Sequence, residues 1–314
     1  MLFYNTVKDL YRKFIFRRCD DEGLAYYFSS DDFEGLNAKA YSFKGNNGQL
    51  LNGNFYFYDN PCEDKIIVFD HGMGGGHLSY MREIEILARH GFKVFAYDHT
   101  GCMKSEGKST VGFTQSLSDL DCCLKALKSE ADLKNKSFAI VGHSWGGFST
   151  LNISAFHSDL THVVVLSGFV SVDIIASRFG ALKKYVKAIE SEANPAYADC
   201  NGAESLKNTK AKALLIYSDN DKMVSKESNY DYLVSTLKGR ENTEIMLEKG
   251  KDHNPNYTQD AVKYLAEYMS AVNKQKKNLR TDEQKKAFRD SFDWKRMTAQ
   301  DEKVWSKILG HLDN

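Results

Sequence analysis

The 314-residue chain lacks the features that mark disulfide-rich, zinc-binding or nucleic-acid-binding proteins. Its six cysteines form no C-x-x-C pair and no Cys/His cluster at zinc spacing, so neither a disulfide framework nor a zinc site is predicted. The 42 basic residues balance 42 acidic ones, and a formal charge of zero gives no field that would attract nucleic acid or an anionic membrane. We therefore expect no nucleic-acid partner and no metal.

Long hydrophobic runs are also absent. The first segment, MLFYNTVKDLYRKFIFRR, is interrupted by charge every few residues, unlike a secretion signal, and no later stretch reaches the length of a transmembrane helix. These observations predict a soluble, cytoplasmic protein with reduced cysteines and no integral membrane segment.

The same first segment predicts an amphipathic helix. Phe3, Val7, Leu10 and Phe14 recur at helical spacing, with basic residues between them. Such a helix either docks on the core of its own domain, which is the commoner outcome, or lies on a membrane through its basic face.

The middle of the chain predicts an α/β fold. Residues 38–43 and 50–58 suit an antiparallel hairpin closed by a glycine-bearing turn. Six short apolar runs follow, mostly separated by segments of helical length, and this alternation predicts a parallel sheet covered by helices on both faces. Prolines are scarce, and all three follow an asparagine outside these runs. The six predicted strands lie at residues 65–72, 92–98, 137–144, 162–168, 212–219 and 243–250.

Two segments depart from the strand and helix alternation. Residues 169–211 form a long, partly helical insertion between two strands, which is typical of a lid. The tail from 274 has two predicted helix starts, at Thr281 and Thr298, each followed three residues later by Gln or Asp. We divide the chain into a lead-in at 1–34, a catalytic domain at 35–273 and a helical extension at 274–314. The apolar residues of the extension have two candidate partners, the catalytic domain or a second subunit in a homodimer.

Residues 142–146, Gly-His-Ser-Trp-Gly, match the pattern G-x-S-x-G at the end of a predicted strand and before a predicted helix. Alone the pattern is weak, but a strand, a tight turn and a helix would force Ser144 into a strained conformation with its hydroxyl exposed. A glycine-rich loop, His71-Gly72-Met73-Gly74-Gly75-Gly76, follows an early strand and lets backbone N–H groups approach a ligand. Ser144 is thus the candidate nucleophile.

On these motifs, residues 35–270 resemble the α/β-hydrolase superfamily, and within it monoacylglycerol lipases, serine aminopeptidases and small bacterial esterases. The resemblance implies a mostly parallel, doubly wound sheet, with Asp221 as the acid in a G-x-x-D-like turn and His253 as the base in a G-x-x-H-like turn. It also assigns the oxyanion hole to the Met73 and Trp145 N–H groups. The residues beside these two loops, His71, Gly72 and His143, are predicted to contact substrate.

Several alternatives stay open at this point. Asp219 is the rival to Asp221, while His77 and His99 are weaker candidates for residues near the pocket. The chain departs from the D-x-R-G-x-G-x-S pattern of relatives, since residues 98–105 read DHTGCMKS without the arginine and the second glycine. That loop often shapes the pocket, so the resemblance says less about substrate than about mechanism.

The predicted function is hydrolysis of a small or medium acyl ester through an acyl-enzyme, without metal or organic cofactor. Cleavage of an amide or peptide is a second alternative. It would require an acidic group in the lid to hold the substrate amine, and the lid offers three candidates for this group. Thioester hydrolysis or acyl transfer is a third. A non-catalytic binding protein on the same fold is the fourth. The lid acids are Asp173, Glu190 and Glu192.

Overall fold

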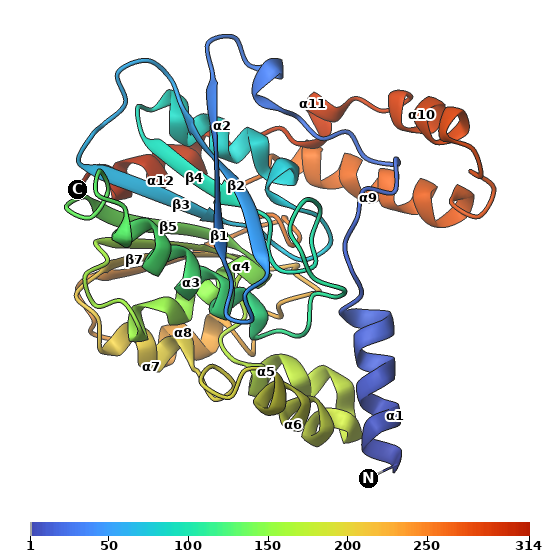
Figure 1. Cartoon of the computed structure of the whole chain (residues 1–314), viewed down its shortest axis with the longest axis horizontal. Helices are drawn as coiled ribbons and strands as arrows, with labels where there is room; N and C mark the ends of the chain where they lie inside the picture. Colours follow the sequence, from blue (N-terminus) through green and yellow to red (C-terminus); the bar gives the residue numbers. More distant parts are fainter. Residues whose placement is uncertain (1) are drawn as a thin grey trace.

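A computed structural model describes residues 2–314 of the chain. Its centre is one eight-stranded sheet in the order β1-β2-β4-β3-β5-β6-β7-β8 (Figure 1). Strands β1 and β2 form the predicted antiparallel hairpin, β2 pairs antiparallel with β4, and the remaining neighbours are all parallel. The strands are β1 Asn37–Lys44, β2 Leu50–Phe57, β3 Lys65–Asp70, β4 Lys93–Tyr97, β5 Ser137–His143, β6 His162–Leu166, β7 Lys212–Ser218 and β8 Thr243–Glu248.

The predicted strands are confirmed. The apolar runs of β3 to β7 are buried on both faces of the sheet, whereas the edge strand β8 is only partly buried. One core cluster packs α2 and α12 on one face, and the other packs α3, α4, α7 and α8 on the opposite face. The arrangement is a doubly wound α/β sandwich of three layers. The helices of these layers are α2 Met81–Arg89, α3 Gln115–Ser129, α4 Trp145–Asn152, α7 Gly202–Lys207, α8 Tyr230–Thr236 and α12 Glu302–Asp313.

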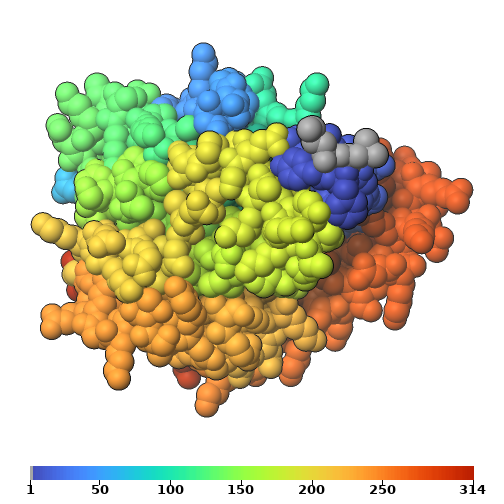
Figure 2. Space-filling model, turned by 90° about the horizontal axis from the view of Figure 1, so that it is seen from below, coloured from blue at the N-terminus to red at the C-terminus, as the bar shows by residue number. Residues whose placement is uncertain are grey.

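The insertion between β6 and β7 is helical. It contains α5 Val172–Ala176, a 3₁₀ segment Ser177–Leu182, α6 Lys183–Ala193 and α7. Helix α7 packs on α4, whereas α5 and α6 lie beside the N-terminal helix on the face shown in Figure 2.

The N-terminal helix α1, Leu2–Leu10, continues into a π-helical turn at Tyr11–Ile15. Its packing differs from the predicted apolar face, because Phe3, Leu10 and Phe14 are exposed. The buried face is instead that of Val7 and Tyr11, which belong to the core, with Tyr4 packed against it. Tyr4 also donates to Glu192 over 2.7 Å, and the buried Tyr11 hydroxyl hydrogen bonds to Glu190.

The C-terminal helices pack within the chain. Helix α9, Gln259–Gln275, is followed by α10 Asp282–Asp290 and α11 Trp294–Met297. Thr281 caps α10 in the predicted capping box. The second predicted start is wrong, because Asp301 and not Thr298 accepts the first amides of α12, while the Thr298 hydroxyl donates back to the Trp294 carbonyl.

The apolar side chains of α12 close one face of the sheet. The α12 residues buried in the sheet's core are Val304, Trp305, Ile308 and Leu312.

Within residues 2–314, none of the helices combines the length and the apolar character that a bilayer crossing requires.

Candidate active site

Ser144 occupies the sharp turn between β5 and α4. Its backbone has φ 57° and ψ −109°, a region that residues with a side chain rarely adopt. The flanking glycines permit the turn, because a Cβ on Gly142 would lie 2.1 Å from the Thr150 hydroxyl and one on Gly146 would lie 2.0 Å from the Asp70 carbonyl. The turn therefore presents the Ser144 hydroxyl at the carboxyl edge of the sheet.

Ser144, His253 and Asp221 form one chain of hydrogen bonds. His253 Nε2 lies 2.7 Å from Ser144 Oγ, and His253 Nδ1 lies 2.7 Å from Asp221 Oδ2. The other oxygen of Asp221 accepts the amides of Met223 and Val224. Burial alone would raise the pKa of Asp221, but the hydrogen bond to His253 and the two amides hold it below its usual value. Asp221 is thus fixed as an anion facing the imidazole.

Asp219, the rival acid, has a different role. It is exposed, and its side chain accepts the Gly250 amide over 2.8 Å. This bond ties the turn after β7 to the turn after β8, which carries His253. Asp219 therefore connects the two turns without reaching the imidazole.

Met73 and Trp145 both line the pocket that contains Ser144. Trp145 begins α4, so its N–H has no acceptor inside the helix. Across residues 2–314, neither the Met73 nor the Trp145 amide donates to another group of the protein. The Trp145 indole is fixed by a 2.7 Å hydrogen bond to the Phe113 carbonyl. Both residues therefore border the space beside Ser144, and their amides have no hydrogen-bond acceptor among the described residues.

The structure does not bring His71, Gly72 and His143 to the lining of this pocket. His143 is buried between the Tyr80 hydroxyl and the His253 carbonyl, each 2.9 Å from a ring nitrogen. His71 is fully buried, and its Nε2 accepts the amide of His99. Burial lowers the pKa of both imidazoles to about 3, so both are neutral supports behind the loops.

His77 is also internal. Its Nδ1 lies 2.7 Å from Asp98 Oδ1, and its Nε2 lies 2.9 Å from the Tyr56 hydroxyl. Burial alone would raise the pKa of Asp98, but His77 outweighs it and lowers that pKa to about 2. This pair anchors the glycine-rich loop to the end of β4.

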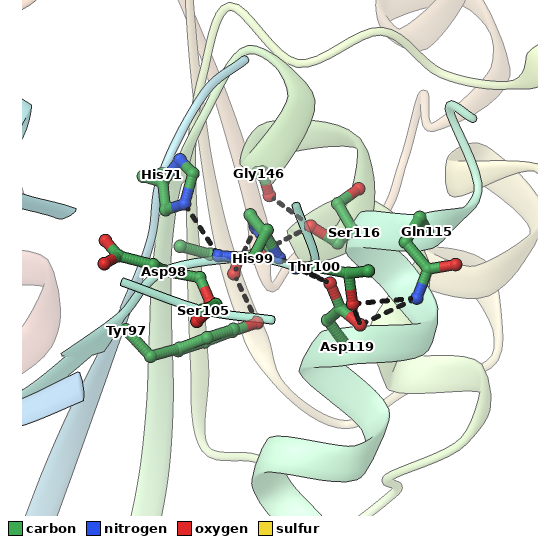
Figure 3. Close-up of polar contacts among 12 residues, drawn as sticks. His71, Tyr97, Asp98, His99, Thr100, Ser105, Gln115, Ser116, Asp119 and Gly146 are labelled. Atoms are coloured by element: carbon green, nitrogen blue, oxygen red, sulfur yellow. Dashed lines mark hydrogen bonds and ion pairs between the residues drawn. The ribbon is translucent and has the colours of Figure 1, made fainter. Parts of the chain in front are cut away.

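His99 is the centre of a buried charged cluster (Figure 3). Its Nε2 lies 3.2 Å from Asp70 and its Nδ1 lies 3.3 Å from Asp119, and all three side chains are fully buried. Burial alone would lower the pKa of His99, but the two carboxylates outweigh it and raise the pKa to about 9. His99 is therefore a buried cation at neutral pH.

This cluster connects the elements around Ser144. Asp119 accepts the amide and hydroxyl of Thr100, each over 2.8 Å, while Asp70 accepts the Ser149 hydroxyl from α4. The His99 ring packs on the Trp145 indole with 4.8 Å between centroids. Sequence reasoning missed the cluster, although Asp70 and His99 both follow buried strands and so had to meet at one sheet edge.

The pocket beside Ser144 has a volume of about 230 Å³ and is mainly apolar. Of the described residues that line it, Arg178 alone carries a charge, and its guanidinium also donates to the Met223 carbonyl. In the part of the chain that the structure describes, no three His, Cys, Asp or Glu side chains converge as metal ligands would. The lining residues are Ile15, Met73, Phe113, Ser144, Trp145, Phe169, Ile175, Arg178, Phe179, Met223 and Val224.

The three acids of the insertion point elsewhere. Glu190 is fully buried and accepts the Phe113 amide and both the amide and hydroxyl of Thr114. Glu192 pairs with Lys8 of α1. Asp173 pairs with two lysines, 2.9 and 3.0 Å away. None of them lines the pocket.

Comparison with known families agrees with this geometry. Residues 61–244 match the sequence model of the serine aminopeptidase family, S33. The chain belongs to the S33 family. This places it in the α/β-hydrolase superfamily, as the order of its strands and the turn at Ser144 also indicate.

Relatives of this S33 chain include hydrolases of different bonds. It is 26% identical over 195 residues to a proline iminopeptidase of Saccharolobus solfataricus, covering 56% of this chain and 59% of that protein. It is 34% identical over 107 residues to a 2-hydroxy-6-oxo-6-(2'-aminophenyl)hexa-2,4-dienoic acid hydrolase of Metapseudomonas resinovorans, covering 32% of this chain and 34% of that one. The matched segment of the S33 chain thus covers about a third to three fifths of the length of these relatives.

Solved structures share the fold more completely. An esterase of Pyrococcus furiosus superposes with a TM-score of 0.60 at 20% identity, over 84% of this chain and 98% of the esterase. The α/β hydrolase GrgF from a Penicillium species gives 0.54 at 16% identity, over 77% and 97% of the two chains. At such low identities, this similarity establishes only the fold of the S33 chain.

Proposed function

We propose that the protein is a serine hydrolase that cleaves a carboxylic ester of a small or medium acyl group. The observation that supports this most directly is the hydrogen-bonded chain from Ser144 through His253 to Asp221, with 2.7 Å at each step. His253 takes the proton of Ser144 as the hydroxyl oxygen attacks the acyl carbon, and Asp221 holds the imidazole in the tautomer that can accept it.

The oxyanion of the tetrahedral intermediate is bound by the Met73 and Trp145 amides in this proposal. Each such donor is worth about 3 kcal/mol of transition-state stabilisation. His253 then protonates the leaving alcohol, and water activated by the same imidazole releases the acyl group from Ser144. The mechanism uses side chains and amides of one chain throughout.

The acyl group is assigned to the apolar pocket under α5 and the following 3₁₀ segment, which act as a lid. Phe113, Phe169 and Phe179 supply most of its aromatic wall, and such a wall favours an uncharged acyl chain. The volume of about 230 Å³ supports a short or medium chain over a long one. A small-molecule ester is therefore the expected substrate.

Cleavage of an aminoacyl amide is the second candidate, and the S33 family and the proline iminopeptidase relative favour it. An aminopeptidase needs an acidic group to hold the substrate amine. Asp173, Glu190 and Glu192 are all engaged elsewhere, and the charged residue at the pocket is the cation Arg178. This arrangement favours the ester.

A homodimer through the C-terminal helices is not needed for this chemistry. The apolar side chains of α12 are buried against the protein's own sheet, and Phe288 of α10 packs against Tyr268 of α9. The proposed site is therefore complete within one chain.

The test is hydrolysis of p-nitrophenyl esters of increasing acyl length by the wild type and by Ser144→Ala. We expect turnover that peaks at short or medium chains and falls by at least about 10³-fold in the variant. Turnover that survives in Ser144→Ala would refute the nucleophile. Wild-type protein that is inactive on esters but cleaves aminoacyl p-nitroanilides or acyl thioesters would refute the ester assignment and keep the mechanism.

A further inference from the structure

The N-terminal arm runs beside the loop that follows β4. Two isolated β-bridges join them, Arg17 to Ser109 and Cys19 to Cys102. The Cys19 amide donates to the Gly101 carbonyl over 2.9 Å, and the Met103 amide donates to the Cys19 carbonyl over 2.8 Å. The bridge therefore holds the two cysteines directly opposite each other.

The two side chains are close enough that each is the largest single influence on the pKa of the other. The Cys19 thiol also donates to the Arg17 carbonyl over 3.8 Å. Residues paired across neighbouring strands have Cα atoms about 4.8 Å apart. That separation lies inside the range of about 4.4 to 6.8 Å that a disulfide spans. The bridge therefore places the two Cα atoms at a separation compatible with a cross-link.

The two cysteines differ in chemical character. Cys19 is half-buried, and its thiol is hydrogen bonded to Cys102; this contact, with the Gly74 amide and Arg17, outweighs burial and lowers its pKa to about 7. Cys102 is fully buried, and both Cys19 and burial raise its pKa. Burial also raises the pKa of Cys122 and Cys200 to about 11. Cys19 is thus the thiol best suited to react as a thiolate.

A reagent can reach Cys19 from solvent. Cys19 lines an open pocket of about 410 Å³ together with Met73 and Gly74 of the glycine-rich loop. Arg17, which borders the same pocket, favours the Cys19 thiolate, and its effect is partly opposed by Asp20. Cys102 lies behind Cys19 and is placed to resolve a product formed on it.

We propose that Cys19 and Cys102 are a redox modification site that forms a reversible disulfide with a hydroperoxide as oxidant. The Cys19 thiolate attacks one peroxide oxygen, the O–O bond breaks, and an alcohol or water leaves after taking a proton. The resulting Cys19 sulfenic acid is attacked by Cys102 sulfur, the S–O bond breaks, and the hydroxyl leaves as water with the Cys102 proton. The two thiols lose two electrons to the peroxide in total.

The cross-link would join the N-terminal arm covalently to the loop after β4. It would also remove the thiol that accepts the Gly74 amide, directly beside Met73. The inference does not depend on the proposed function, because the modification is read from mass and not from turnover.

The experiment treats the purified full chain with a small molar excess of hydrogen peroxide and then with iodoacetamide, followed by intact and peptide mass spectrometry. We expect the wild type to lose the mass of two hydrogens and to yield one peptide pair joined through Cys19 and Cys102. Dithiothreitol should reverse the change. Cys62→Ser, which removes an exposed cysteine, should behave as the wild type.

Two variants complete the test. Cys19→Ser should form no disulfide, while Cys102→Ala should retain oxygen on Cys19 because the resolving thiol is missing. Iodoacetamide should label Cys19 in reduced protein at least about tenfold faster than Cys122 or Cys200. If Cys102→Ala does not fold, the wild-type peptide map and Cys19→Ser decide the matter. The proposal is overturned if the wild type gains oxygen on Cys19 without linking, links another pair, or is unchanged.

Discussion

His99 lies against the indole of Trp145, with 4.8 Å between the ring centroids, and it has a carboxylate on either side. Trp145 is the residue whose amide is proposed to bind the oxyanion. Both flanking acids, Asp70 and Asp119, are fully buried. The imidazolium therefore compensates two buried charges directly behind the nucleophile turn, and its loss would leave them uncompensated.

We predict that His99→Gln lowers the stability of the protein by about 3 kcal/mol or more at neutral pH. The effect depends on pH in a defined direction. The pKa of His99 is raised from 6.5 in the unfolded chain to about 9 in the fold, so its contribution is complete below pH 6.5 and is lost as pH rises through about 9. Melting temperatures of the wild type and the variant should therefore differ most at low pH and converge above pH 9.

The surface histidine His90, which pairs with Asp313, is the matched control. His90→Gln should leave the melting temperature and its pH dependence unchanged. A stability difference between wild type and His99→Gln that is constant from pH 6 to pH 10 would contradict a charged His99. If His99→Gln does not fold, Asp119→Asn should show the same convergence in weaker form.

Asp221 and Asp219 offer a matched pair on one turn. Asp221→Asn should lower kcat by about 10⁴-fold, because the amide holds the imidazole in the wrong tautomer for accepting the Ser144 proton. Asp219→Asn should lower kcat by less than about tenfold, since asparagine keeps a side-chain oxygen that can accept the Gly250 amide. Kinetics on the best p-nitrophenyl ester measures both, and equal losses in the two variants would reopen the choice of acid.

Much of the fold follows from local patterns. Six strands are recognisable from short, continuous apolar runs, and five of them, β3 to β7, are buried on both faces of the parallel sheet. Ser144, Asp221 and His253 each follow one of these strands, and the carboxyl ends of parallel strands meet at one edge. Their approach was therefore predictable without any knowledge of side-chain contacts.

The rest depended on contacts between distant residues. Helix α1 buries Val7 and Tyr11 against the core and leaves Phe3, Leu10 and Phe14 exposed, so its apolar spacing alone did not identify the buried face. His71 and His143 are neighbours of the reactive groups along the chain, yet internal hydrogen bonds turn both away from the pocket. Pattern reasoning places residues on elements, but it does not decide which side of a loop a side chain takes.

The close packing of the nucleophile turn gives a third prediction. Gly146→Ala places a methyl group 2.0 Å from the Asp70 carbonyl, which no rotamer can relieve, so we expect a loss of at least about 2 kcal/mol and of most turnover. Gly310→Ala in α12 is the control, because nothing lies within 4 Å of its added carbon. That change should stabilise the protein by about 0.5 to 1 kcal/mol. Denaturant midpoints measure both, and a neutral Gly146→Ala would contradict the described turn.

Glu190 gives the fourth prediction, because it connects the insertion to the pocket. Its two oxygens accept four donors: the Tyr11 hydroxyl, the Phe113 amide, and the amide and hydroxyl of Thr114. Phe113 lines the pocket, and its carbonyl accepts the Trp145 indole. In Glu190→Gln an NH₂ group would face two of these donors, so we expect a loss of about 2 to 4 kcal/mol. Phe113 and the aromatic wall of the pocket would shift as a result.

Glu192→Gln is the matched control for this change, since Glu192 is exposed and pairs with Lys8 on the surface. It should leave the denaturant midpoint and kcat/KM unchanged. Glu190→Gln should instead lower kcat/KM for the preferred ester even at temperatures where the variant is fully folded, because Phe113 and Trp145 lose their common anchor. If the two variants were indistinguishable in both measurements, Glu190 would not position Phe113. The apolar packing of the pocket would then be what holds Phe113 in place.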